Sequence, residues 1–385
     1  MAKIISYKNP ELATIKDNKA LWNLPKTRRF GYRNLHKINR YGLFLRSDLV
    51  LKLKKNYKKE IGVKPLVKRL TKSKSFCSLI VGNGQSILFE KYAKDFSYSQ
   101  PQTIMSITKM FANLFVGELL KNKKINLNKN VSYYLPKIGS GYANAKVQDI
   151  LNMNVVNAYT EDYTKAYSSS FMHEPVGGWR LPKSGQIKLS QEQYLNTIKN
   201  IKNRDLKNNT EYALYKSANT DVIGLIIEKI SGIPLRDWFL SAVEAAGFED
   251  GLYIASDRYG MPWLSGGGCL ITRDFLRMGL LFARKGKGVG KRQIGSAKFL
   301  NQTIKNICPK YMELSRNKYL YYSNSTMTSG NVIGHSGYGG QYLAINLKTG
   351  NVAAFFSVLE TKSATKESYK KDMINMLIDI VNDKY

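Results

Sequence analysis

The sequence predicts an α+β protein in which an antiparallel sheet is built from both ends of the chain. Residues 76–92 (FCSLIVGNGQSILFEKY) form two β-rich runs around the turn residues GNG, which is typical of a hairpin. Residues 341–347 and 351–358 are two further strand-like runs around a KTG turn. The long segment between these regions is dominated by helical patterns, so we expect helices on the sheet and a mostly helical insertion.

The first expected helix covers residues 48–60 (DLVLKLKKNYKKE), with Ser47 as N-cap and Gly62 just beyond its end. Residues 106–120 are apolar at helical spacing and nearly apolar all round, which predicts a buried helix. Residues 305–330 are expected to form loops that help to shape a pocket. The remaining expected helices cover residues 147–153, 191–201, 220–232, 272–286 and 366–383.

These elements suggest three regions. Residues 1–75 are predicted to be a basic N-terminal extension with a helix. Residues 76–120 and 266–385 together form the predicted α/β domain, and residues 121–265 form the helical insertion.

The chain is strongly basic, with a formal net charge of +32 over 385 residues. Residues 1–74 carry 21 lysines and arginines against four acids, and such a field attracts nucleic acid, anionic lipid or an acidic substrate. A whole-chain richness in Lys, Asn, Ile and Tyr explains the same charge without selecting a partner. We therefore expect no nucleic-acid or anionic-membrane partner, although the sequence leaves both open.

The remaining composition favours a globular protein of the cytoplasm. There is no apolar run of 18 residues and no apolar segment typical of a secretory signal. Cys77, Cys269 and Cys308 are odd in number and widely spaced, which suits buried, reduced thiols. No Cys or His cluster has metal-ligand spacing, so we expect neither a metal nor another cofactor.

The stretch GHSGYGG (334–340) resembles the nucleophile turn of an α/β-hydrolase, but it fails the requirements of that turn. Tyr338 occupies a position that needs glycine, because the sharp turn leaves no room for a side chain two residues after the serine. That fold also needs a histidine after the serine, and none follows Ser336. The segment that follows is strand-like rather than helical. Ser336 is therefore not the expected nucleophile.

A serine can instead be activated by a lysine three residues later, because both side chains then lie on one face of a helix. A buried lysine loses its charge more readily and can accept the hydroxyl proton. Only Ser106 opens an apolar helix that would bury its lysine, Lys109. The pattern Ser-x-x-Lys occurs at Ser106/Lys109, Ser315/Lys318, Ser363/Lys366 and Ser368/Lys371.

Three motifs in order resemble those of the penicillin-recognising serine hydrolases, which include class C β-lactamases, DD-peptidases and related esterases. The resemblance is greatest to the aminohexanoate-dimer hydrolases and covers roughly residues 20–385. It implies a β-lactamase/transpeptidase-like fold. The motifs are Ser106-Ile107-Thr108-Lys109, Tyr215-Lys216-Ser217-Ala218-Asn219 and His335-Ser336-Gly337, and the aminohexanoate branch adds Thr160-Glu161-Asp162-Tyr163 and Gly178-Trp179-Arg180.

The resemblance implies a role for each matching residue. Ser106 is the expected nucleophile, Lys109 its activating partner, and Tyr215 the proton donor to the leaving group. A neighbouring lysine is expected to lower the pKa of the Tyr215 phenol. Tyr163 is expected to close over the substrate amide.

Other matching residues are expected to bind substrate. Glu174 lies where the aminohexanoate branch has an aspartate that holds the substrate's amino end. The third motif is expected to be an edge strand beside the nucleophile, and an N–H near Tyr338 would complete an oxyanion hole with that of Ser106. Lys348-Thr349-Gly350 spells the β-lactamase form of this motif, but we expect only a hairpin turn there. The expected substrate-binding residues are Tyr163, Glu174, Asn219, His335, Ser336, Gly337 and Tyr338.

The sequence thus indicates a serine hydrolase that cleaves small amides or carboxylic esters through an acyl-serine intermediate. The alternative is a penicillin-fold binding protein whose basic N-terminal region acts on anionic lipid or nucleic acid. The first hypothesis is favoured because Ser106, Lys109 and Tyr215 are present together.

Overall fold

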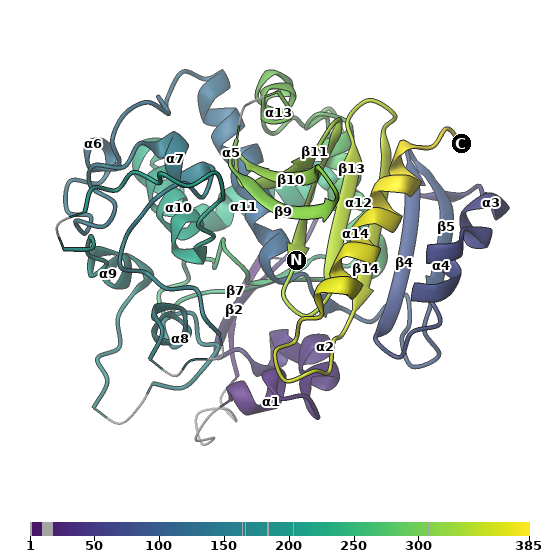
Figure 1. The fold of residues 1–385 in the computed structure, drawn as a ribbon, viewed down its shortest axis with the longest axis horizontal. Helices are drawn as coiled ribbons and strands as arrows, with labels where there is room; N and C mark the ends of the chain where they lie inside the picture. The colour runs from purple at the N-terminus through teal and green to yellow at the C-terminus, as the bar shows by residue number, and fades with distance from the viewer. Residues whose placement is uncertain are drawn as a thin grey trace.

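The structure is a computed structural model that describes residues 2–9, 18–163, 165, 167–182, 185–202, 204–305 and 308–385. Nine strands in this part of the chain form the main sheet (Figure 1). All neighbours are antiparallel except β3 and β5. In spatial order the strands are β3 (Lys54–Lys55), β5 (Ser86–Tyr92), β4 (Phe76–Asn83), β14 (Asn351–Ser357), β13 (Gln341–Asn346), β12 (Val332–Gly337), β11 (Thr326–Ser329), β10 (Lys318–Ser323) and β9 (Lys310–Ser315).

The pairing of β4 with β14 joins the two ends of the chain, as the sequence predicts. Phe355 of β14 lies opposite Leu79 of β4, and the hairpin β4–β5 continues the sheet outward. The mixed α+β class with an antiparallel sheet is therefore confirmed.

A long helix packs on each face of the main sheet. Successive side chains on a strand point to opposite faces. On β13, Leu343 packs toward α12 (Thr272–Ala283), while its neighbour Ala344 belongs to the cluster on the side of α14 (Glu367–Asn382). In Figure 1 helix α14 lies in front of β13 and β14.

A second, five-stranded sheet was not predicted. Its order is β1 (Ile4–Lys8), β2 (Tyr41–Leu45), β7 (Leu252–Ala255), β8 (Gly268–Leu270) and β6 (Gln102–Thr103). Strands β1 and β2 come from the basic N-terminal region, so this region contributes to the fold. Helices α1 (Lys19–Asn23) and α2 (Arg28–Ile38) lie between these two strands in the chain, and the buried Arg28 donates to the carbonyl oxygens of Leu359 and Thr361.

The helix predicted over residues 48–60 is wrong. Residues 54–55 form β3 beside β5, and the backbone N–H of Asn56 donates to the Ile87 carbonyl. Leu51 is buried while Leu49 and Val50 are exposed, so the apolar side chains do not form one helical face. Helices begin only afterwards, with α3 (Lys59–Val63) and α4 (Pro65–Leu70).

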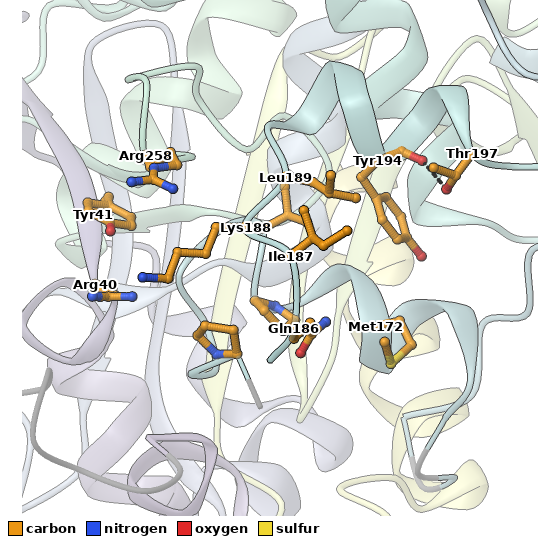
Figure 2. Close-up of a pocket in the computed structure, with 13 residues that line it drawn as sticks. Arg40, Tyr41, Met172, Gln186, Ile187, Lys188, Leu189, Tyr194, Thr197 and Arg258 are labelled. Atoms are coloured by element: carbon orange, nitrogen blue, oxygen red, sulfur yellow. Dashed lines mark hydrogen bonds between the residues drawn. The ribbon is translucent and has the colours of Figure 1, made fainter. Parts of the chain in front are cut away.

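The middle of the chain is helical, in agreement with the expected insertion; the domain boundaries themselves remain a prediction. The connection before α9 helps to line a surface cavity, in which Ile187 and Leu189 lie with Tyr194 (Figure 2). The helices of this region are α6 (Val131–Tyr134), α7 (Val147–Leu151), α8 (Ser169–His173), α9 (Gln191–Asn196), α10 (Ser217–Ser231) and α11 (Leu235–Ala246), and α13 (Ala297–Thr303) follows later.

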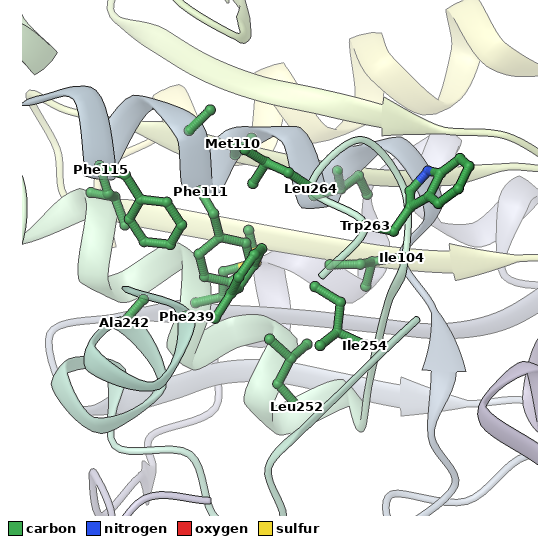
Figure 3. Close-up of a cluster of buried hydrophobic side chains, with 14 of the residues drawn as sticks. Ile104, Met110, Phe111, Phe115, Phe239, Ala242, Leu252, Ile254, Trp263 and Leu264 are labelled. Atoms are coloured by element: carbon green, nitrogen blue, oxygen red, sulfur yellow. The ribbon is translucent and has the colours of Figure 1, made fainter. Parts of the chain in front are cut away.

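A large apolar core surrounds the helix that follows Ser106. Helix α5 (Met110–Lys121) is buried on nearly all sides, as its composition predicts. Phe111 and Phe115 contact Phe239 of α11 edge to face, with ring centroids 5.1 and 5.2 Å apart (Figure 3). The same cluster includes Ile254 of the second sheet, so it fixes α5 against that sheet.

Residues 310–329 form β9, β10 and β11 instead of the expected loops. Their tight turns place Asn317, Asn324 and Ser325 at positive φ, a conformation that Asn in particular tolerates. Because these strands continue the sheet past β12, the prediction that β12 is an edge strand is wrong.

Helices in the described ranges are all too short or too polar to cross a bilayer.

Candidate active site

Ser106 lies in a strained turn between the second sheet and α5. It is the second residue of the 3-10 helix η2 (Met105–Lys109), and Met105 just before it has a φ of 49°. Such a conformation is costly for a residue with a side chain and is maintained only by surrounding contacts. Thr108 supplies two of them, since its Oγ1 donates to the Met105 carbonyl at 2.7 Å and accepts from Gly268 N at 3.0 Å.

The Lys109 amine is completely buried and contacts three oxygen atoms. Its Nζ lies 3.1 Å from Ser106 Oγ and 3.1 Å from Ser217 Oγ, and it donates to the carbonyl oxygen of Ser265. Burial lowers the pKa of Lys109 to about 8, while the nearby Glu161 and Asp221 carboxylates oppose the shift. An appreciable fraction of Lys109 is therefore neutral near neutral pH.

The hydrogen-bond directions around Lys109 leave its lone pair for Ser106. The Ser265 carbonyl can only accept. Ser217 Oγ donates to Glu161 Oε1 at 2.6 Å, so it must accept from Lys109. A neutral amine has two N–H groups, and both are used by these two acceptors. The free electron pair of Lys109 therefore faces the Ser106 hydroxyl.

Three polar groups outside the predicted set hold this arrangement. Glu161 Oε2 accepts from Ser217 N at 2.8 Å, where a carboxylate also complements the positive end of α10. The Asp221 carboxylate accepts from Ser265 N at 3.0 Å, which holds the turn whose carbonyl meets Lys109. Lys216 donates to the Asn157 and Tyr159 carbonyls, and burial lowers its pKa to about 8.

Tyr215 lies beside this centre, but its hydroxyl has no hydrogen-bond partner among the described residues. Lys109 Nζ instead lies 5.0 Å from the centroid of the Tyr215 ring. The pKa of Tyr215 is well above its usual value, first because of burial and then because of neighbouring groups such as Tyr322. The expectation of a lowered phenol pKa is therefore wrong, because burial outweighs the single cation.

The end of β12 packs directly on the Ser106 turn. A Cβ on Gly337 would lie 2.5 Å from the Ile104 carbonyl oxygen, so only glycine allows this approach. β11 pairs with β12 only as far as Gly334, so one backbone edge of Ser336 and Gly337 lies beyond that ladder. Because of this unpaired backbone, the end of β12 resembles an edge strand locally.

Two cavities meet at Ser106. The outer cavity of about 480 Å³ extends toward the start of α14, and the inner cavity of about 60 Å³ extends toward α8. Ser106, Tyr163 and Tyr338 line both cavities. The Tyr163 and Tyr338 rings lie 5.1 Å apart, so the two tyrosines contact each other across the junction.

Each cavity has a distinct lining. The outer cavity combines apolar and aromatic surface with charged residues of both signs, and the inner one is enclosed by aromatic rings. The outer lining includes Glu161, Tyr215, Tyr311, Ser336, Gly337, Lys366, Tyr369 and Lys370. The inner lining includes Trp22, Tyr159, His173, Glu174, Trp179, Ser217, Trp263 and Gly266.

Glu174 lines the inner cavity but is already paired. Lys19 Nζ lies 2.7 and 2.9 Å from its two oxygens, and Arg180 Nε lies 3.7 Å from Oε2. Lys19 comes from the N-terminal region, and no sequence pattern predicts this contact. The carboxylate that the resemblance assigns to a substrate amine is therefore neutralised from within the chain.

Two of the expected substrate-binding residues lie away from the described cavity linings. Asn219 is fully buried in α10, and its Oδ1 accepts from the Tyr142 hydroxyl at 2.9 Å. His335 is also fully buried, with its Nε2 3.1 Å from the Tyr322 hydroxyl, and burial lowers its pKa well below the usual value. Direct substrate contact by these two residues stays a prediction; in the structure they support the α10 start and the β12 end. The described side chains contain no group of three or more His, Cys, Asp or Glu able to hold a metal.

Comparisons with known proteins show the family and the fold of the chain. The Beta-lactamase family profile matches residues 78–371. The 6-aminohexanoate-dimer hydrolase of Paenarthrobacter ureafaciens is 27% identical over 222 residues, which are 56% of this chain and 54% of that protein. The match thus spans about half the length of that relative.

Two solved structures share the fold. A Bacillus anthracis protein, provisionally named as a 6-aminohexanoate-dimer hydrolase, superposes with a TM-score of 0.78 at 18% identity, covering 94% of this chain and 95% of that one. A penicillin-binding protein from Bacillus halodurans gives a TM-score of 0.53 at 13% identity, covering 82% and 99%. At these identities the similarity concerns the fold. Because the family profile spans most of the chain, the protein belongs to the beta-lactamase family.

Proposed function

We propose that this protein is a serine hydrolase that cleaves small amides or carboxylic esters through an acyl-Ser106 intermediate. The observation that supports the proposal most directly is the contact of Ser106 Oγ with the buried Lys109 amine at the junction of two cavities. A relative named 6-aminohexanoate-dimer hydrolase adds support for an amide substrate. The proposed steps use only groups of this chain.

In the acylation step neutral Lys109 takes the proton of Ser106 Oγ while that oxygen attacks the substrate carbonyl carbon. The resulting oxyanion accepts from Ser106 N, an early 3-10 helix N–H, and from the N–H of Tyr338 just beyond β12. The lysine proton then passes to the leaving nitrogen or oxygen as its bond to the carbonyl carbon breaks. We assign this transfer to the Tyr215 phenol, which its raised pKa keeps protonated: it gives its own proton to the leaving group and takes the lysine proton in exchange.

In the deacylation step a water takes the place of the leaving group. Lys109 accepts a proton from this water as its oxygen attacks the acyl carbon, and Ser106 Oγ recovers the proton when the ester bond breaks. We assign Tyr163 to cover the reacting carbonyl, because it lines both cavities and donates to Glu161. Closure by such a ring excludes water from the first step.

The proposed mechanism predicts that activity rises with pH. Lys109 must be neutral to accept a proton, and its pKa is about 8. Below pH 8 we expect kcat/KM to fall about tenfold per pH unit, and above it to level off. The measurement is kcat/KM for a p-nitrophenyl ester from pH 6 to pH 9, corrected for spontaneous hydrolysis. A flat profile, or a loss of activity as pH rises, would contradict the assignment of Lys109 as base.

The paired Glu174 predicts preference for an uncharged acyl group. With Lys19 in place, the inner cavity should accept hexanoyl p-nitroanilide better than its 6-aminohexanoyl counterpart. Lys19→Met leaves a buried carboxylate without its main partner, so we expect the ratio of the two kcat/KM values to shift by about tenfold toward the amine. Lys19→Arg retains the charge and should leave the ratio near that of the wild type. An unchanged ratio in Lys19→Met would remove Glu174 from acyl-group selection.

The direct test of the proposed function is covalent labelling. We expect a fluorophosphonate probe to modify the wild-type protein once, at the peptide that contains Ser106. A panel of p-nitrophenyl esters, aminohexanoate dimer and nitrocefin then ranks ester, linear amide and β-lactam substrates. Labelling at another serine would overturn the proposal, whereas labelling of Ser106 without turnover of any substrate would leave a reactive serine and no demonstrated hydrolase.

The alternative of a binding protein acting through the basic N-terminal region has weaker support. Arg29 and Arg33 pair with Asp95, and Arg28 is buried, so part of that charge serves the fold. As compartment we propose the cytoplasm, which suits the three free and buried cysteines.

A further inference from the structure

A third cavity lies behind the inner one, on the far side of the segment that contains α8. We call it the rear cavity; its volume is about 280 Å³. It shares no lining residue with the two cavities at Ser106.

The charged lining of the rear cavity is entirely cationic. Arg40, Lys188 and Arg258 line it, no described acid does, and Figure 2 shows all three around Tyr41 at one side. None of the three has an ion pair with another residue in the part of the chain that the structure describes. The nearest acid in sequence, Asp257, uses its carboxylate to accept backbone N–H groups, among them that of Gln191 at 3.1 Å.

Two of the three cations adjoin strands of the second sheet. The Arg40 backbone N–H donates to the Gly178 carbonyl at 3.0 Å, and the Ser256 N–H donates to the Tyr41 carbonyl at 3.2 Å. Arg40 and Arg258 therefore enter the cavity from segments that are fixed to each other through β2 and β7. Like charges gathered without counter-charges among the described residues repel one another, and an anion placed among them relieves that repulsion.

The opposite part of the rear cavity is apolar. Met172 and Tyr194 lie away from the three cations in Figure 2, and Val176 and Leu189 add aliphatic surface. Ile187 also borders the cavity, and its side chain is 78% exposed, a high value for a large aliphatic residue. A cavity with one cationic and one apolar part matches a molecule with an anionic head and a short hydrocarbon tail. Its volume falls slightly below the usual range for small-molecule pockets, which excludes a two-chain lipid.

The wall between the rear and inner cavities is shared. Met172, Pro175 and Val176 face the rear cavity, whereas His173 and Glu174 line the inner one. A ligand in the rear cavity and a substrate in the inner cavity therefore contact opposite sides of the same segment, residues 172–176.

Stacked rings extend this contact toward the active site. Tyr194, a rear-cavity residue, stacks on His173 with centroids 4.3 Å apart, and His173 lies 4.4 Å from the ring of Trp263. Trp263 in turn lines the inner cavity. A change in the position of Tyr194 is therefore transmitted to an aromatic wall of the active site.

We propose that the rear cavity binds a small amphiphile with an anionic head, a carboxylate or phosphate, and a short aliphatic tail. Arg40, Lys188 and Arg258 hold the head, and the surface formed by Met172, Val176, Leu189 and Tyr194 takes the tail. The site is separate from Ser106, so its occupancy does not depend on the proposed hydrolase activity.

Isothermal titration with full-length protein tests the proposal, using four probes with the same chain: octanoate, octyl phosphate, octanol and octyltrimethylammonium. We expect the two anions to bind and the neutral and cationic probes to bind at least about tenfold more weakly. The order of the two anions distinguishes a carboxylate from a phosphate ligand. Binding should also change the tryptophan fluorescence, since Trp263 is in the ring stack.

Variants locate the binding to this cavity. The triple variant Arg40→Gln, Lys188→Gln, Arg258→Gln should weaken anion binding at least about tenfold. The matched control Lys52→Gln, Lys72→Gln, Lys124→Gln removes three positive charges at exposed positions and should bind as the wild type does. The thermal midpoint of each variant establishes that it is folded. Equal binding of octanol and octanoate, equal losses in both triple variants, or no loss in the first would overturn the proposal.

Discussion

Ser106→Ala is expected to abolish fluorophosphonate labelling and to lower kcat by more than about 10⁴-fold. The reason is that Ser106 Oγ contacts the buried Lys109 amine and lies where the two cavities meet. An alanine methyl group fits the same space, so the fold and the thermal midpoint should change little. The measurements are labelling stoichiometry by intact mass and initial rates on the best substrate of the panel.

Two other serines provide matched controls. Ser315 begins another Ser-x-x-Lys pattern but is exposed on β9, so Ser315→Ala should label and turn over as the wild type does. Ser336 lines the outer cavity, and Ser336→Ala should retain labelling even where KM changes. If Ser106→Ala labels as fully as the wild type, the nucleophile has been assigned wrongly and the proposed acyl-enzyme must be abandoned.

The sequence predicted the central strands of the main sheet but neither its outer strands nor the second sheet. Strands β4 and β14 are fully or nearly fully buried, mostly apolar and flanked by clear turns, which local patterns detect. Strands β9 and β10 are rich in Tyr, Lys and Ser and partly exposed, so they resemble loops until β12 provides a template. β6 has only two residues, and nothing local marks it as a strand.

The same distinction applies to the site. Ser106 and Lys109 were predictable because their contact depends on helical spacing and on an apolar helix that buries the lysine. Ser217 and Glu161 belong to motifs visible in the sequence, yet their role depends on two loops and α10 meeting in space. The one available signal for Ser217 was its place two residues after Tyr215, at the start of a predicted helix. Lys19 is 155 residues from Glu174 in the chain, and no periodic pattern links them.

Lys109→Met is expected to lower kcat/KM by about 10³-fold while the protein remains folded. Methionine has a similar length and is apolar, so it fits a fully buried position and removes only the amine. Without Lys109, the Ser106 hydroxyl loses the group whose electron pair faces it, and the rise of activity with pH near 8 should disappear. This loss of the pH dependence separates a missing base from a general disturbance of the site, which would lower activity equally at every pH.

Lys348 provides the control for this substitution, because it heads the sequence Lys348-Thr349-Gly350 that spells the β-lactamase motif. In the structure it is an exposed residue in the turn between β13 and β14, where its N–H donates to Asn346 Oδ1 at 2.8 Å. Lys348→Met should therefore leave both kcat/KM and its pH profile unchanged. Suppose instead that Lys348→Met loses activity and Lys109→Met retains it. The third motif then lies at the turn and not at the end of β12. In that case the hydrogen-bond directions derived for Lys109 have no role in catalysis. The opposite outcome supports the buried amine, held by Ser217 and the Ser265 carbonyl, as the base that activates Ser106.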